Sequence, residues 1–322
     1  MPGADELIDR ENLAATTNGD RAQAPEQTCA ACGRAGLEPH MSVGGEIGED
    51  GLIPTTKEFG TALGDIVRCA NCGHMQLDRF PSDAELAGAY AEAASDDYVD
   101  EEAGQRESFR SVLARIERYA ERGAILDVGC WVGFLLDEAR ARGWRETTGI
   151  EPSLFASGYA RSKLGLDVRT EDLFDAELPG RHYDAVVLGD VLEHLTAAGA
   201  ALDRVAGLLA PGGVLALELP DAGSRVARLL GPRWWSVIPT HVHYFTRESA
   251  ATMLRRHGYA PLYVATDPKA FTVRYYLDKI GGYSPALASA LVGAAARAGI
   301  DERMWTPDFR DRMIMIARGP AA

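Results

Sequence analysis

The sequence lacks long apolar runs and is short of positive charge, and each absence argues against a class of partner. No apolar stretch in the 322 residues approaches the roughly 20 residues of a membrane-spanning helix. The start, MPGADELIDRENLAATTNGD, has no hydrophobic signal-peptide core. The 33 lysines and arginines face 47 acidic residues, a net charge of −14, which disfavours binding to nucleic acid or anionic membranes. We therefore expect a cytoplasmic protein without either partner, while its oligomeric state stays open.

Cysteine is scarce, yet four of the five cysteines fall into a regular pattern. Cys29, Cys32, Cys69 and Cys72 form two C-x2-C pairs separated by 36 residues, and a glycine follows each pair. Two such pairs can surround one metal ion tetrahedrally, and the glycine permits a tight turn. Two disulfides, or cysteines that only fill the core, are the alternatives, and a reducing cytoplasm disfavours the first. The spacing predicts a closed structural zinc site, with the nearby His74 expected to be exposed.

The composition along the chain predicts four segments. Residues 1–25 are polar without apolar periodicity and predict a disordered tail. Residues 26–80 hold the zinc-binding module, and residues 81–123 read as a helical linker. From 124 to 322 strand-like and helix-like stretches alternate, which predicts an α/β domain with a parallel sheet covered by helices on both faces. Ligands of such sheets bind beyond the carboxyl ends of the strands.

Four consecutive predicted strands each end on an acidic residue. The first is followed by a glycine-containing turn, and the others place carboxylates where they could accept hydrogen bonds from a ribose, from an adenine amino group or from the rest of a cofactor. Any single acid could equally be a solvated loop residue or a helix cap. Four together are less easily explained by chance. The acids are Asp127, Glu151, Asp172 and Asp190.

These motifs together resemble the class I S-adenosylmethionine-dependent methyltransferases. ILDVGCWVGFLL resembles the glycine-rich first motif of that family, GIEPS its ribose-binding acid and EDLFD its adenine-contacting segment. DAVVLGDVLEHL and LLAPGGVLALELP resemble two later motifs, and DRMIMIARG resembles its antiparallel last strand. The resemblance implies a Rossmann-like, seven-stranded α/β fold with S-adenosyl-L-methionine as cofactor. It implies a cofactor site made of Asp127, Gly129, Cys130, Trp131, Gly133, Glu151, Pro152, Asp172, Leu173 and Asp190.

Trp131 departs from the family pattern, which most often has glycine at this position. Its side chain must point away from the cofactor as a packing residue, which we favour, or lie along the methionine end of the cofactor. Cys130, the fifth cysteine, reads as a small buried residue of the same turn. An NAD-linked Rossmann enzyme and a non-catalytic methyltransferase-like scaffold are the alternatives to this interpretation.

The methyl acceptor should be a small molecule that binds among insertions at about 220–245 and 267–310. Within the first insertion, His241 and His243 stand close together before Phe245, and His194 follows the fourth strand end. Each is a candidate general base, although His243 could instead only pack the start of a helix capped by Thr246. The zinc-binding cysteines and His241 resemble sugar C-methyltransferases, but Thr240 replaces a glutamate of that group and its C-terminal domain is missing. We therefore expect transfer to a hydroxyl of a nucleotide-linked sugar or a natural-product intermediate, with C-methylation as the alternative.

Overall fold

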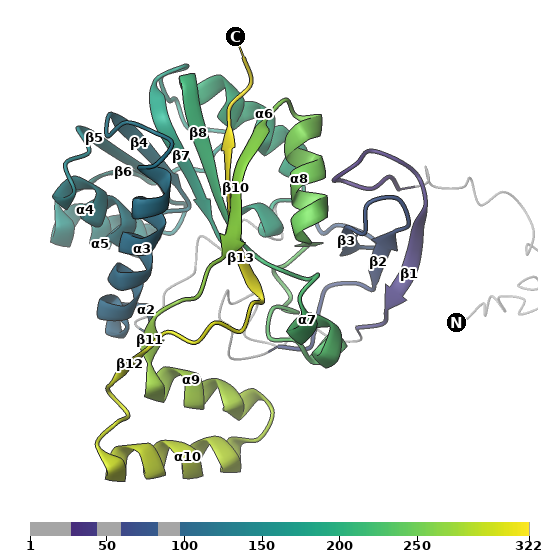
Figure 1. The fold of residues 1–322 in the computed structure, drawn as a ribbon, viewed down its shortest axis with the longest axis vertical. Helices are drawn as coiled ribbons and strands as arrows, with labels where there is room; N and C mark the ends of the chain where they lie inside the picture. Colours follow the sequence, from purple (N-terminus) through teal and green to yellow (C-terminus); the bar gives the residue numbers. More distant parts are fainter. Residues whose placement is uncertain (1–26, 44–58, 83–96, 322) are drawn as a thin grey trace, which may run out of the picture.

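The computed structural model describes residues 27–43, 59–82 and 97–321, and the predicted tail at 1–25 lies outside them. The largest element is a sheet of seven strands (Figure 1). In sheet order the strands are β10 (Ala260–Thr266), β13 (Arg312–Arg318), β8 (Leu209–Pro220), β7 (Tyr183–Gly189), β4 (Ala124–Val128), β5 (Glu146–Ile150) and β6 (Asp167–Arg169).

The direction of the strands confirms the predicted fold class. The five strands from β8 to β6 run parallel to one another, whereas β13 is antiparallel to both of its neighbours. The DRMIMIARG stretch therefore forms the antiparallel strand that its resemblance implied. All five residues of the central strand β4 are buried, because helices cover this sheet on both faces.

Alternate residues of the strands pack against two separate helical layers. Ile125 of β4 packs with residues of α3 (Glu102–Ile116), α4 (Phe134–Ala141) and α5 (Leu154–Leu164). The next residue, Leu126, packs with α6 (Ala198–Leu208) and α8 (Arg247–Arg256) on the opposite face. This alternation follows from the two-residue period of a strand. The two layers lie on opposite sides of the sheet in Figure 1.

Helix α8 begins where the sequence predicts. The hydroxyl of Thr246 accepts a hydrogen bond from the backbone N–H of Ser249 at 3.1 Å, and the Ser249 hydroxyl accepts one from the N–H of Thr246 at 2.9 Å. This reciprocal capping fixes the end of the segment that precedes the helix. That segment contains His241 and His243.

The N-terminal module shares its sheet with the main domain. Its strands β1 (Leu37–Met41), β2 (Ile66–Cys69) and β3 (Met75–Leu77) pair in that order, and β3 pairs with β9 (His243–Tyr244). The chain therefore does not divide cleanly at residue 80, because the fourth strand comes from the predicted 220–245 insertion. That insertion also contains α7 (Arg225–Leu230) and the 3-10 helix η2 (Gly231–Arg233).

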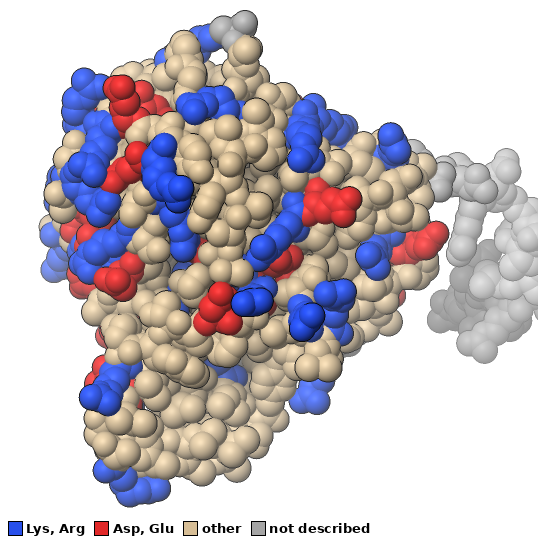
Figure 2. Space-filling view, viewed as in Figure 1, with Lys and Arg blue, Asp and Glu red and all other residues tan. Residues whose placement is uncertain are grey.

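A helical arm extends from one end of the seven-stranded sheet (Figure 1). It lies within the predicted 267–310 insertion and begins and ends with two short strands that pair with each other. On the face shown in Figure 2, this arm carries few charged side chains. Its elements are β11 (Phe271–Thr272), α9 (Val273–Lys279), η3 (Ile280–Gly282), α10 (Pro285–Ala298) and β12 (Met304–Trp305).

Two short helices complete the described elements, α2 (Asp97–Asp100) and η1 (Leu192–His194). Among the described residues, no helix combines the length and apolarity needed to cross a membrane.

Candidate active site

A cavity of about 700 Å³ opens at the carboxyl ends of the parallel strands. Its wall includes the glycine turn after β4, the acids that follow β5 and β7, and residues of the helical arm. This is the position at which parallel α/β sheets bind their ligands. The volume lies within the range of small-molecule sites, which is about 300–1,000 Å³.

The turn after β4 needs a left-handed backbone at three positions. Gly129 has φ = 69° and Gly133 has φ = 85°, and glycine adopts such angles at little cost. Trp131 has φ = 49°, which a side chain disfavours by about 1–2 kcal/mol. The turn thus keeps the conformation expected of glycine at a position occupied by tryptophan.

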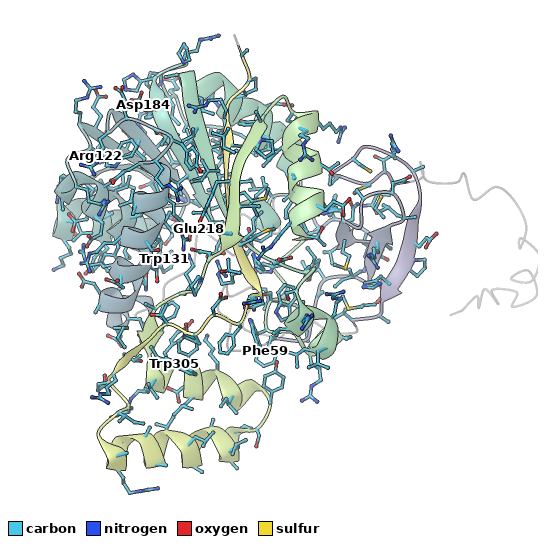
Figure 3. The ribbon with its side chains drawn as sticks, in the orientation of Figure 1. Phe59, Arg122, Trp131, Asp184, Glu218 and Trp305 are labelled. Carbon is cyan, nitrogen blue, oxygen red and sulfur yellow. The ribbon has the colours of Figure 1, made fainter. Side chains whose placement is uncertain are left out.

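The Trp131 side chain packs against α5 and also borders the cavity. Its ring packs near Phe155, with 6.3 Å between the ring centroids, and against the cluster of Val132, Phe134 and Ala156. The residue also lines the cavity. Figure 3 shows Trp131 beside the end of the sheet. Packing against α5 therefore holds one wall of the cavity in place.

Glu151 connects the end of β5 to this turn. One carboxylate oxygen accepts a hydrogen bond from the backbone N–H of Trp131 at 2.9 Å, and the other accepts one from Ser153 at 2.9 Å. Burial raises the pKa of Glu151, although these two N–H groups oppose the rise. The backbone N–H of Trp131 is therefore used by Glu151. Each carboxylate oxygen keeps a second lone pair for a ligand hydroxyl.

Replacing Glu151 by alanine should weaken binding of S-adenosylmethionine by about 1–3 kcal/mol, because a buried charged acceptor and the anchor of the Trp131 turn are lost together. Calorimetric titration measures the change. Glu146→Ala, at the exposed start of the same strand, is the matched control and should leave the affinity unchanged. Equal affinity in both variants would rule out the proposed ligand contact.

Three acidic residues from β4, β8 and the end of β5 line the cavity, namely Asp127, Glu218 and Glu151. Asp127 is buried, and its pKa is raised by burial and then by the nearby carboxylates of Glu218 and Glu151. Such a group of carboxylates favours a positively charged ligand, which would relieve their mutual repulsion. Cys130 is buried in the same turn, as predicted.

The remaining predicted cofactor residues lie along one side of the cavity. Pro152, Leu173 and Asp172 all line it. One oxygen of Asp172 accepts hydrogen bonds from the backbone N–H groups of Phe174 and Asp175, at 2.7 and 2.9 Å. Asp172 is exposed, and its other oxygen accepts no hydrogen bond within this turn.

Asp190 has a partner that the sequence did not indicate. It forms an ion pair with Arg312, the first residue of β13. Lys269, just before the arm, pairs in turn with Glu218 and, at 3.1 Å, with Asp267. Sequence analysis missed these cavity-lining residues apart from Asp190. Only Glu218 left a signal, as an acid inside the apolar strand motif VLALELP.

Two of the three predicted histidines meet at the cavity wall. The rings of His194 and His241 are inclined at 74° to each other, with centroids 4.5 Å apart, and both residues line the cavity. Nδ1 of His194 donates to the carbonyl of Thr240 at 3.0 Å, and Nδ1 of His241 donates to that of Ser236 at 2.8 Å. Burial lowers the pKa of His194 to about 4. Burial, and then the neighbouring His194, lower that of His241 well below its usual value.

His241 precedes β9, whereas His243 lies within this strand, which pairs with β3, and does not line the cavity. It is buried, and its Nδ1 lies 3.3 Å from Nε2 of His74. Its ring also contacts Phe80 and Phe245, which corresponds to the packing alternative. The expectation that His74 is exposed is wrong, since its side chain is fully buried.

The four predicted metal ligands converge. Sγ of Cys29 lies 3.6 Å from that of Cys72, and Sγ of Cys32 lies 3.6 Å from that of Cys69. All four sulfurs lie within 4.8 Å of one another, and none of the cysteines forms a disulfide. Tetrahedral Zn–S bonds of about 2.3 Å require sulfur atoms about 3.8 Å apart. The sulfur positions therefore fit a single tetrahedral ion.

Comparison with known families agrees with this geometry. The model of a family described as "Methyltransferase domain" matches residues 102–264, just over half of the chain. The chain belongs to this methyltransferase-domain family. Its matched segment runs from α3 into β10 and contains the glycine turn, the acidic strand ends and the paired histidines. The membership supports S-adenosylmethionine as the cofactor, and the cluster of carboxylates around Asp127 suits that positively charged molecule.

Individual relatives match a smaller part of this methyltransferase-domain protein than the family model does. A ubiquinone biosynthesis O-methyltransferase of Bradyrhizobium sp. is 35% identical over 101 residues, which cover 29% of this chain and 38% of the relative. An uncharacterized methyltransferase of Mycobacterium bovis is 34% identical over 95 residues, covering 29% of this chain and 48% of the relative. The matches thus span less than half the length of these relatives.

Solved structures extend the fold comparison beyond the matched segment. A chain from the complex of a methyltransferase activator with a methyltransferase of Haloferax volcanii superimposes with a TM-score of 0.50. It is 14% identical and covers 75% of this chain and 100% of its own length. At this identity the likeness shows the fold alone.

Proposed function

We propose that this protein transfers the methyl group of S-adenosylmethionine to a hydroxyl group of a small molecule. The observation that carries the proposal is that one cavity joins two chemically different walls. One wall holds the Asp127–Glu151 carboxylates of the donor site, and the other holds His194 and His241. A donor bound at the first wall would face an acceptor at the second.

The two imidazoles supply a suitable proton acceptor. Because a carbonyl oxygen can only accept, each Nδ1 carries the hydrogen, and Nε2 keeps a lone pair. Their lowered pKa values keep both rings neutral near pH 7. We propose His241 as the base that receives the hydroxyl proton while S-adenosylmethionine, when bound, supplies the methyl group. His194 orients the acceptor or serves as the second base candidate.

The shape of the acceptor end favours a molecule with a substantial apolar surface. The arm presents Tyr275, Tyr276 and Trp305 to the cavity, and Phe59 approaches from the N-terminal module. Figure 3 places Phe59 and Trp305 between the arm and the sheet. A natural-product intermediate fits this lining. A nucleotide-linked sugar remains the second acceptor class, favoured by the likeness of the zinc-binding cysteines and His241 to sugar C-methyltransferases.

We further propose that the four cysteines bind one structural zinc ion. The observations in favour are the four converging sulfurs and the two left-handed glycines, Gly33 and Gly73, that close the turns around them. All four ligand positions are protein sulfurs. The site would therefore stabilise the module instead of taking part in the reaction.

Mass spectrometry of candidate acceptors, incubated with the protein and a methyl-labelled donor, tests the function. We expect one labelled methyl group on an oxygen of an apolar or sugar-containing hydroxyl compound. Labelling of a carbon would instead support the C-methyltransferase alternative. Failure to bind S-adenosylmethionine in calorimetry would contradict the proposal and favour the non-catalytic scaffold.

A further inference from the structure

Three potential metal ligands converge at the histidine wall of the cavity, remote in sequence from the four cysteines. Glu193 and His194 belong to η1 after β7, and His241 precedes β9. One ligand atom from each of the three lies within 4.8 Å of the other two. Oε1 of Glu193 is 3.9 Å from Nε2 of His241. Two histidines and one carboxylate form a ligand set typical of divalent transition metals.

The burial of the Glu193 carboxylate is not explained by its contacts within the protein. Its exposed fraction is 1%, and neither carboxylate oxygen has a hydrogen-bond partner among the described residues. A carboxylate buried in this way is unfavourable unless a cation or a proton neutralises it. Burial, and then the charge of Asp190, raise the pKa of Glu193.

The two imidazoles are already arranged as metal ligands. Each Nδ1 donates to a backbone carbonyl, Thr240 for His194 and Ser236 for His241. Metal-binding histidines are held by this kind of outer contact, which fixes the tautomer and directs the opposite nitrogen toward the ion. Both rings are neutral near pH 7, which is the form that binds a metal.

We infer that Glu193, His194 and His241 bind a divalent transition metal ion at the acceptor wall of the cavity. Bonds of about 2.0–2.2 Å from oxygen and nitrogen require the ligand atoms to close from 3.9 Å to about 3–3.5 Å, a side-chain adjustment. The imidazoles favour iron or zinc over magnesium or calcium, and the carboxylate also suits manganese. Three protein ligands leave coordination positions open toward the cavity.

This inference rests on the proposed function and assigns a way of activating the acceptor. An acceptor hydroxyl bound to the ion would lose its proton to water more readily. The oxygen then forms a bond to the methyl carbon while the carbon–sulfur bond breaks. The electron pair of that bond stays on sulfur, leaving a neutral thioether. His241 would act here as a ligand, whereas without the ion it acts as the proton acceptor.

Manganese binding to the full-length protein, with zinc retained in the four-cysteine site, tests the inference. Electron paramagnetic resonance reports free Mn²⁺, and a four-thiolate site does not favour this ion. We expect one bound Mn²⁺ per chain. Glu193→Gln, which preserves size, should weaken the binding at least about 10-fold. Glu177→Gln, an exposed change of the same charge, is the matched control and should bind like the wild type.

Two results would overturn the site: no manganese binding by the wild type, or equal binding by Glu193→Gln. His194→Gln serves as a second variant if Glu193→Gln does not fold, and it too should lose the ion. A different result would contradict the proposed function: the protein would not bind S-adenosylmethionine, or it would not transfer the methyl group. A protein that binds no manganese yet methylates its acceptor in the presence of a chelator keeps the proposed function and loses only the metal site.

Discussion

His241→Ala should lower methyl-transfer turnover by about 100-fold or more, with little change in the affinity for S-adenosylmethionine. The substitution removes the imidazole at the acceptor wall, whether it receives the proton or holds a metal ion. The proposed donor contacts at Glu151 and Asp127 remain. Turnover with saturating acceptor and calorimetric titration of the donor measure the two effects separately.

The pH dependence of wild-type activity tests the role of His241 independently. Under the proposal, neutral His241 is the active form, so activity should fall as acid protonates it. Because burial and the neighbouring His194 lower its pKa, the fall should begin below the ordinary histidine range near 6.5. An unperturbed imidazole would instead protonate at about pH 6.5.

His182→Ala is the matched control for His241→Ala, because His182 pairs with Glu146 at the other end of the sheet. It should retain wild-type turnover. If His241→Ala also retains it, His194→Ala becomes the next test. Near-normal turnover of both variants and of the double variant would exclude a histidine base and leave alignment of the two substrates as the source of catalysis.

Cys69→Ser should abolish zinc binding and unfold much of the N-terminal module. Structural zinc contributes apparent binding energies of about 10–16 kcal/mol in small zinc-binding domains, more than such a module can replace by packing. The effect should reach the active site, since Cys69 ends β2, β2 pairs with β3, and β3 pairs with the strand two residues after His241. Turnover should fall strongly, whereas donor affinity should stay close to that of the wild type.

Elemental analysis and hydrogen exchange measure this outcome. We expect about one zinc per wild-type chain, and faster exchange in the described parts of 27–82 once it is lost. Cys130→Ser removes the one cysteine outside the cluster and should retain the zinc. A metal-free wild type with unchanged exchange in this region would contradict a structural role for zinc.

Features of the fold and the site that depend on neighbouring residues could be predicted from the sequence, whereas those that depend on distant contacts could not. Consecutive strand ends appear in the sequence as an apolar run followed by an acid, so Asp127 and Glu151 could be located in advance. A parallel sheet brings such ends to one edge as a consequence of its topology. The cysteine pairs are local in the same sense, because their spacing carries the geometry of the site.

The sequence misled where the position of a side chain depended on pairing with a distant strand. His241 and His243 look equivalent in the motif THVHYF, but β9 pairs with β3 and turns His243 into the core beside His74. The ion pairs of Lys269 with Glu218 and of Arg312 with Asp190 join segments far apart in the chain. No short pattern encodes such partners.

By itself, the sequence determined the α/β fold class, the glycine turn and strand-end acids of the candidate cofactor site, and the four candidate metal ligands. Each of these depends on hydrophobic period, residue type and short spacing, which are properties of neighbouring residues. Only the tertiary structure decided that the cysteine module shares a sheet with the main domain, and that Glu193 meets His194 and His241. Those contacts depend on where distant segments pack against one another. Burial then lowers the pKa values of His194 and His241, which keeps both imidazoles neutral near pH 7.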